Sequence, residues 1–211
     1  VFYKVKGRKS RPAEYQHFYE WARFSGVKFN FKNVSEKIDI ENFINIWIVN
    51  IFCGNSDPYQ GIALLDKNDK NSKWFWLMWD MNHSFVNIYE PEKKHSWEKE
   101  LPVKFVYSVE KKETDPRFFI FRELIFNDNE FRNIFKKRLE EKLNYVLTKD
   151  FLNSVVEDNS TVARSFGIDM SRSDSDLYDF MDKRPEYVMN MMNRFFKLGE
   201  VKKVKYIIPA G

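Results

Sequence analysis

The spacing of apolar residues along the chain predicts a mainly helical protein. The clearest case is Ile40–Cys53, where large apolar side chains recur every three or four residues, as on one face of a helix. Asp39 stands where an N-cap is expected, and Gly54 stands where helices commonly end. The same spacing predicts further helices over residues 12–25, 118–126, 128–147, 149–156 and 174–197, with Pro185 expected to break or kink the last one.

Two short apolar runs, 61–65 and 74–79, flank a polar turn rich in Asp and Asn and predict a β-hairpin. Residues 201–208 indicate a further strand, and residues 83–116, with their prolines and charges, an irregular excursion. The basic residues 1–11 fit either a short strand or a solvated arm. We therefore expect a mainly helical α+β fold. We interpret residues 1–211 as one domain that is a piece of a longer chain, with an upstream region missing.

The composition predicts a core built on aromatic rings, because Phe, Tyr and Trp make up 18% of the 211 residues. The net charge of +4 is small and spread along the chain, which argues against nucleic acid as a partner. A single cysteine, Cys53, excludes an internal disulfide and a multi-cysteine zinc site. Glycine-rich phosphate loops, HExxH and GxSxG are absent, and so is an apolar stretch of transmembrane length.

Two aspartates are candidates for chemistry because of where they stand. Asp57 lies in the polar loop between the clearest helix and the first strand, and Asp80 directly follows the apolar run WFWLMW. A carboxylate at the mouth of an apolar hairpin is costly to desolvate unless it is paired or binds a cation. Together with Asn82, the two residues offer the hard oxygen ligands that suit Mg²⁺. A plainer alternative is that Asp57 caps a turn and Asp80 accepts backbone hydrogen bonds at a strand end.

Three segments resemble the spore-coat-protein-H (CotH) kinase family. They read IDIENFI at 38–44, GNSD at 54–57 and WDMN at 79–82, and the family shows an iD.e.fi.y helix, a gn.D loop, a hairpin and a WDxD segment in this order. The resemblance covers most of the chain. It implies an atypical protein kinase fold of which this chain is the large lobe, with the hairpin at the site. It also implies Mg²⁺ (or Mn²⁺) and ATP as cofactors, a protein substrate, and an extracytoplasmic or cell-surface location.

Carried over residue by residue, the resemblance makes Asp57 the catalytic-loop aspartate, which orients a substrate hydroxyl or accepts its proton. Asp80 becomes the aspartate that holds Mg²⁺ against the ATP phosphates. Asn82 replaces the second acidic residue of WDxD, which keeps an oxygen ligand but loses a charge. Kinase-like sites usually place Asn five residues after the catalytic Asp, where this chain has Ile62; Gln60 is a nearby amide.

A nucleotide-anchoring lysine belongs to the small lobe of such a fold, and nothing distinguishes Lys4, Lys6 and Lys9 as candidates here. Residues 1–211 alone are therefore not expected to turn over ATP. Two other classes of function stay open. One is a degenerate, non-catalytic relative that serves as a surface binding or adhesion module with a protein partner. The other is a metal-dependent hydrolase that uses the same aspartates.

Overall fold

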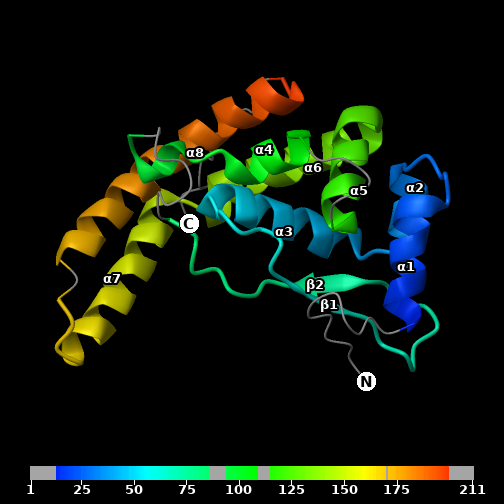
Figure 1. Ribbon diagram of the computed structural model, residues 1–211. Coiled ribbons are helices and arrows are strands. Elements are labelled where there is room, and N and C mark those ends of the chain that lie inside the picture. The colour runs from blue at the N-terminus through cyan, green and yellow to red at the C-terminus, as the bar shows by residue number, and fades with distance from the viewer. Residues whose placement is uncertain (1–12, 86–93, 109–114, 170, 200–211) are drawn as a thin grey trace, which may run out of the picture.

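The computed structural model describes residues 13–85, 94–108, 115–169 and 171–199, and it is mainly helical with one short hairpin (Figure 1). In chain order the elements are α1 (Ala13–Phe24), α2 (Phe31–Ser35), α3 (Ile40–Cys53), β1 (Ile62–Leu64), β2 (Phe75–Leu77), the 3-10 turn η1 (Ser96–Glu98), α4 (Leu101–Ser108), α5 (Pro116–Asn127), α6 (Asn129–Glu141), the π-helical turn η2 (Lys142–Val146), α7 (Lys149–Ser165) and α8 (Ser171–Phe196). The predicted α+β class is confirmed.

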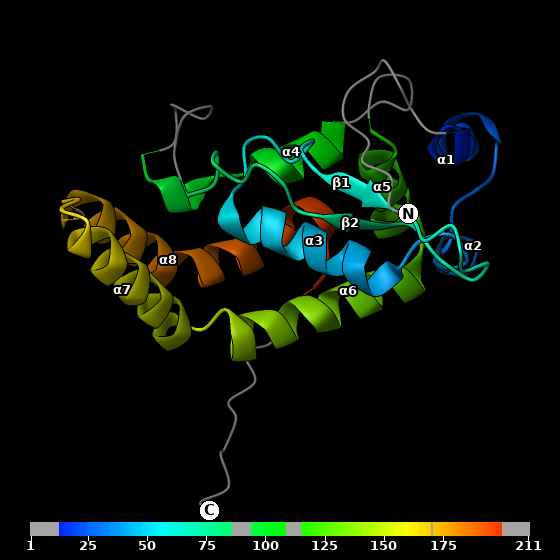
Figure 2. The same ribbon diagram turned by 90° about the horizontal axis from the view of Figure 1, so that it is seen from below.

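Helix α3 is the central element, and it contacts β2, α4, α6 and α8 (Figure 2). Its predicted ends are confirmed. The Asp39 carboxylate accepts a hydrogen bond from the Asn42 N–H at 3.0 Å. Gly54 ends the helix in the left-handed conformation, with φ of 59°, which glycine adopts without steric cost. The cap and the stop therefore fix where the following loop begins.

The hairpin is antiparallel, with Ala63 paired to Trp76 at its centre. It is fastened to α3 by Asn42, whose side chain accepts from the Trp76 N–H at 2.8 Å and donates to the Trp76 carbonyl at 3.0 Å. An amide side chain is suited to this role because it carries both a donor and an acceptor. The strand that leads toward Asp80 is thus held to the helix that leads toward Asp57.

Aromatic rings form the centre of the core, as predicted. Phe121 of α5 is fully buried and stacks on Trp47 of α3, with ring centroids 4.6 Å apart. Edge-on contacts join Phe121 to Phe43, Phe131, Phe135 and Phe196. Rings in such pairs add to the free energy gained from burial itself. One phenylalanine therefore links α3, α5, α6 and α8.

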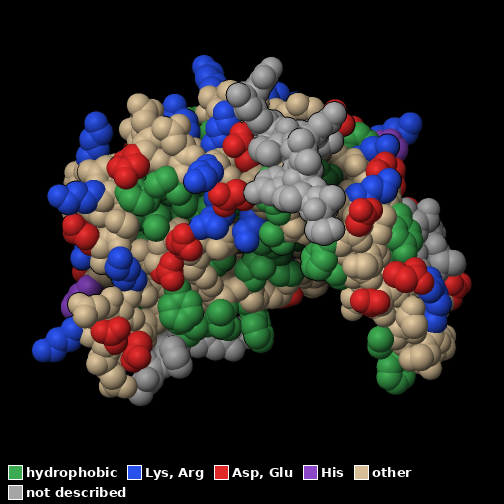
Figure 3. Space-filling view, turned by 180° about the vertical axis from the view of Figure 1, so that it is seen from behind, with side chains coloured by type: hydrophobic (Ala, Val, Ile, Leu, Met, Phe, Trp, Pro, Cys, Tyr) green, Lys and Arg blue, Asp and Glu red, His purple; other side chains and the backbone are tan. Residues whose placement is uncertain are grey.

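Helix α7 and the N-terminal part of α8 pack against each other and project from the body as an arm (Figure 1), with a hollow between the arm and the rest of the molecule (Figure 3). On the face shown there, Lys and Arg side chains are interspersed with Asp and Glu. Apolar side chains of α7, including Phe151 and Val162, are more than half exposed. Within the described residues, no helix combines the length and the apolarity needed to cross a membrane.

Several predictions about elements were wrong. The excursion predicted for 83–116 contains η1 and helix α4, and α2 was not predicted. The helix predicted to end at 156 continues to Ser165, because the buried Ser160 prolongs its packed face. Of the break or kink predicted at Pro185, the break does not occur, because α8 is continuous from Ser171 to Phe196. Residues 1–12 and 201–208 lie outside the described residues.

Replacing Phe121 with Ala tests the aromatic core. We expect the free energy of unfolding to fall by about 3–5 kcal/mol, because the cavity would lie among rings from several helices. Urea denaturation followed by circular dichroism measures this loss. The matched control is Phe166→Ala, at a ring that is 80% exposed, where we expect a change within about 0.5 kcal/mol. Equal effects of the two substitutions would contradict the assignment of Phe121 to the core.

Candidate functional site

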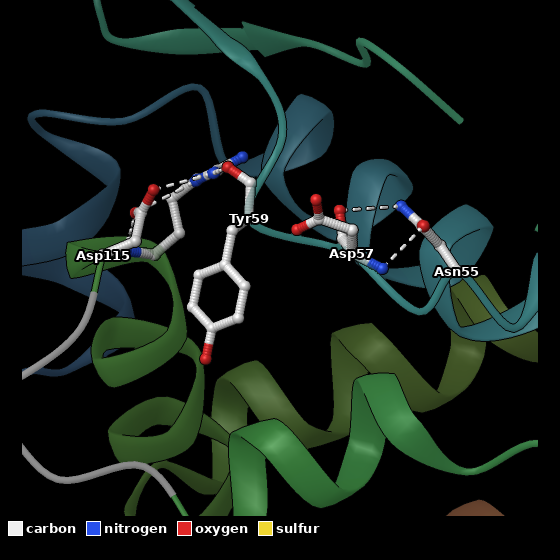
Figure 4. A network of polar contacts seen from close by, with 5 residues as sticks. Asn55, Asp57, Tyr59 and Asp115 are labelled. Atoms are coloured by element: carbon white, nitrogen blue, oxygen red, sulfur yellow. Dashed lines mark hydrogen bonds and ion pairs between the residues drawn. The ribbon is translucent and has the colours of Figure 1, made fainter. Parts of the chain in front are cut away.

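Asn55 fixes the backbone of Asp57. The Asn55 side chain is fully buried; its Oδ1 accepts from the Asp57 N–H at 3.0 Å, and its Nδ2 lies 3.3 Å from the Asp57 carbonyl (Figure 4). The same Nδ2 donates to Asn50 Oδ1 of α3 at 2.8 Å. Buried polar groups that satisfy one another in this way restrict a loop to one conformation. The loop after α3 thus presents Asp57 from a fixed backbone.

The Asp57 carboxylate is half-buried and accepts a hydrogen bond from Gln60 Nε2 at 3.1 Å. The Gln60 N–H also bonds to the Asp57 carbonyl, which closes a turn over residues 57–60. Gln60 therefore turns its amide toward Asp57, a contact that its position in the sequence left open. Ile62, where kinase-like sites usually have Asn, lies half-buried at the start of β1.

Arg117 holds the far end of this loop. Its buried guanidinium forms a two-point ion pair with Asp115, through Nε at 3.0 Å and Nη2 at 2.7 Å, and Nη2 also donates to the Tyr59 carbonyl at 2.7 Å. Burial alone would lower the pKa of Arg117, but Asp115 raises it above the ordinary value. Gly61 passes so close that an added Cβ would lie 2.5 Å from Arg117 Nη1. A side chain at residue 61 is therefore not compatible with the observed position of Arg117.

Tyr59 lies between the carboxylates of Asp57 and Asp115 (Figure 4). Its ring stacks on Phe118 with centroids 4.4 Å apart and meets Phe105 edge-on at 5.4 Å. Partial burial raises the pKa of the Tyr59 hydroxyl, and the charges of Asp115 and Asp57 raise it further. The hydroxyl is therefore protonated at neutral pH, and it points away from Asp57 (Figure 4).

Asp80 and Asn82 follow β2 and are both exposed. Asp80 adopts a left-handed backbone, with φ of 56°, and so does Phe85, with φ of 61°. Asp tolerates this conformation better than most residues, whereas for Phe it is strained. The Phe85 N–H bonds to the Cys53 carbonyl at 2.9 Å, which ties this strained end to the end of α3. Strain held in this way is typical of functional segments.

The structure brings the two aspartate-bearing loops into direct contact. The N–H of Ser56, which precedes Asp57, bonds to the His83 carbonyl at 3.3 Å. Asn55 Nδ2 lies 3.3 Å from the thioether sulfur of Met81, which follows Asp80. Each contact joins a residue close to Asp57 in the chain to a residue close to Asp80. The two loops therefore meet at neighbours of the aspartates. The convergence of the two carboxylates and the chemical roles of Asp57, Asp80 and Asn82 stay predictions.

The donor set fits a metal that arrives with a phosphate ligand. Among the residues that the structure describes, no three His, Cys, Asp or Glu side chains form a group suited to hold a metal ion by themselves. Mg²⁺ is typically held by one or two carboxylates together with phosphate oxygens and water. Asp80 and Asn82, both accessible, offer one carboxylate and one amide oxygen of that kind.

The comparison with known protein families matches residues 4–195 to the family described as CotH kinase protein. The chain belongs to this family, and the resemblance found in the three sequence segments is confirmed. No curated protein and no solved structure gives a match.

Sequence reasoning missed the residues that support the site. Arg117 and Lys99 are buried cations, and neither was a candidate from the sequence. Asn55 lies within the GNSD segment, so a signal for its role was present. Met81 lies inside WDMN, but only the structure shows its contact with Asn55.

Gly61→Ala tests the close approach to Arg117. We expect the free energy of unfolding to fall by about 1–3 kcal/mol, because the new methyl group must displace a buried, ion-paired guanidinium. Urea denaturation provides the measurement. Gln60→Ala, at the exposed neighbour, is the control, with an expected change of about 0.5 kcal/mol or less. An unaltered midpoint for Gly61→Ala would show that Arg117 lies elsewhere.

Cys53 provides a chemical probe of the end of α3. Burial raises the pKa of its thiol to about 12, although Arg184 opposes the rise. At pH 8 the folded chain should therefore react with an alkylating reagent on the order of 10³-fold more slowly than the chain unfolded in urea, since only the thiolate is nucleophilic. The rate should keep rising with pH beyond 9. Equal rates for folded and unfolded chain would contradict this placement of Cys53.

Proposed function

We propose that this chain carries the phosphoryl-transfer site of a CotH-family kinase, which moves the γ-phosphoryl group of ATP to a Ser or Thr hydroxyl of a protein in a Mg²⁺-dependent reaction. The observation that carries the proposal is the contact between the two aspartate-bearing loops at Ser56 and His83. Membership of the family supplies the kind of reaction. The proposed location, by the same resemblance, is extracytoplasmic or at the cell surface.

Asp57 is the proposed catalytic carboxylate. Its backbone is fixed by Asn55, and one carboxylate oxygen accepts from Gln60. A base whose orientation is set before substrate arrives loses little entropy in reaching the hydroxyl proton. Asp57 would thus orient the acceptor hydroxyl and take its proton as the new O–P bond forms.

Asp80 is the proposed metal ligand, assisted by Asn82. Both are accessible and follow the strand that is fastened to α3. When bound, Mg²⁺ would neutralise charge on the ATP phosphates and position them. The contribution of the chain is to hold the Asp80 carboxylate beside the Asp57 loop. Replacement of the second acidic residue by Asn82 weakens the expected metal affinity, because a charge is lost.

One observation favours the second candidate function, a non-catalytic binding module at a surface. Ile62, half-buried in β1, stands where a kinase-like site usually supplies an asparagine oxygen. An apolar side chain cannot replace that ligand. In this alternative the fold would be retained as a scaffold for a protein partner, without phosphoryl transfer.

Calorimetry of Mg·ATP and Mn·ATP binding by the full-length protein tests the proposal. We expect Asp80→Asn to weaken metal-dependent binding by about tenfold or more, because the only proposed carboxylate ligand is lost. Asp57→Asn should retain binding but lower phosphoryl transfer to a protein acceptor by about 10²–10⁴-fold. Asp150→Asn, at an exposed residue of α7, is the matched control and should behave as the unmodified protein.

The contrary outcome is equally definite. If the folded, unmodified protein binds neither Mg·ATP nor Mn·ATP, the catalytic proposal is rejected and the binding module remains. Folding is checked independently by circular dichroism and by the slow alkylation of Cys53.

A further inference from the structure

Lys99 lies directly behind both aspartate-bearing loops. It stands between η1 and α4, and its side chain is fully buried. Lysine is almost never fully buried unless its nitrogen finds partners. Here Nζ donates a short hydrogen bond to Ser56 Oγ and lies 3.3 Å from the His83 carbonyl. One side chain therefore contacts the residue before Asp57 and a residue three positions after Asp80.

Ser56 adds two hydrogen bonds to this junction. Its N–H and its Oγ each lie 3.3 Å from the same His83 carbonyl that Lys99 approaches. Three donors thus converge on one backbone oxygen. A buried lysine nitrogen loses stabilisation when it loses such acceptors, because burial has removed the water that could replace them. Any arrangement in which the two loops separate is therefore penalised.

The backbone of Lys99 is itself fixed from behind. Its carbonyl accepts a hydrogen bond from Arg184 Nη1 at 2.7 Å. Gly54 packs against its side chain so closely that an added Cβ would lie 3.1 Å from the Lys99 Cβ. The nitrogen of Lys99 therefore extends from a rigid base, and its reach decides where the two loops meet.

We propose that Lys99 is a positioning residue that sets the separation of Asp57 and Asp80, with Ser56 and the His83 carbonyl as the atoms through which it acts. The importance of this separation for chemistry rests on the proposed function, in which the two carboxylates serve one phosphoryl group. The junction itself is a property of the unliganded chain. Lys99 does not touch the reacting atoms in this assignment; it acts only through the two loops.

The first experiment needs no ligand. Hydrogen exchange followed by mass spectrometry or NMR is measured on the unliganded full-length protein and on Lys99→Met and Ser56→Ala. We expect exchange at the amides of residues 56 and 85 to become about tenfold faster or more in both variants. The amide of residue 56 loses its His83 acceptor, and the segment from His83 to Phe85 is freed to leave the end of α3. Amides of α6 should keep their rates. Lys70→Met, at an exposed loop residue, is the control for the lysine substitution, and Ser154→Ala, on α7, for the serine.

The second experiment measures the metal concentration for half-maximal nucleotide binding by the same variants. A lysine that only stabilised the core would lower the melting temperature and leave this concentration unchanged in the folded fraction. We expect it instead to rise about tenfold in Lys99→Met and by a smaller factor in Ser56→Ala, because Asp80 is displaced relative to Asp57. Where Lys99→Met does not yield folded protein, Ser56→Ala alone decides.

Different outcomes would overturn the role of Lys99 and the proposed function. Unchanged exchange at Ser56 and Phe85 in a folded variant overturns the role of Lys99, and so does an unchanged metal requirement in variants that still bind nucleotide. Absence of nucleotide binding in the unmodified protein overturns the proposed function instead. In that case, accelerated exchange in both variants still supports Lys99 as the residue that joins the loops.

Discussion

Arg184 is the residue on which the arrangement of the site depends. Its guanidinium is fully buried in α8 and donates hydrogen bonds to four backbone carbonyls, which belong to Ile51, Phe52, Trp97 and Lys99. The last carbonyls of a helix have no partner within the helix, and a cation there is also favoured by the helix dipole. Arg184 thus joins the end of α3 to the segment that carries Lys99.

From that junction, buried cations hold the Asp57 loop at both of its ends. Lys99 binds Ser56 on one side of Asp57, and Arg117 binds the Tyr59 carbonyl on the other. Each cation is buried, and each binds a short piece of backbone that has no regular secondary structure. A loop can carry a functional carboxylate only if something outside the loop removes its freedom. In this protein, side-chain cations do so.

The features that were predicted correctly from the sequence are those that depend on interactions between residues close in the chain. Helix α3 was predicted within its observed bounds because Asp39 and Gly54 mark its ends, and the hairpin because turn residues separate two apolar runs. The candidate aspartates came from their setting and from the family resemblance. Helix α4 was missed because prolines and charges surround it. Lys99 could not be found either, because its burial depends on partners that lie 16, 43 and 85 residues away in the chain.

The position of Arg184 also bears on how the protein folds. Its hydrogen bonds to the end of α3 span 132 and 133 residues, so they form only after synthesis has passed residue 184. Until α8 docks, the segments that carry Asp57 and Asp80 lack the hydrogen bonds from Arg184 that fix the end of α3 and Lys99. A chain interrupted before residue 184 would contain both aspartates and lack the scaffold behind them. A ligand that requires both loops in place would therefore bind only chains in which α8 has docked, and would stabilise them selectively over earlier states.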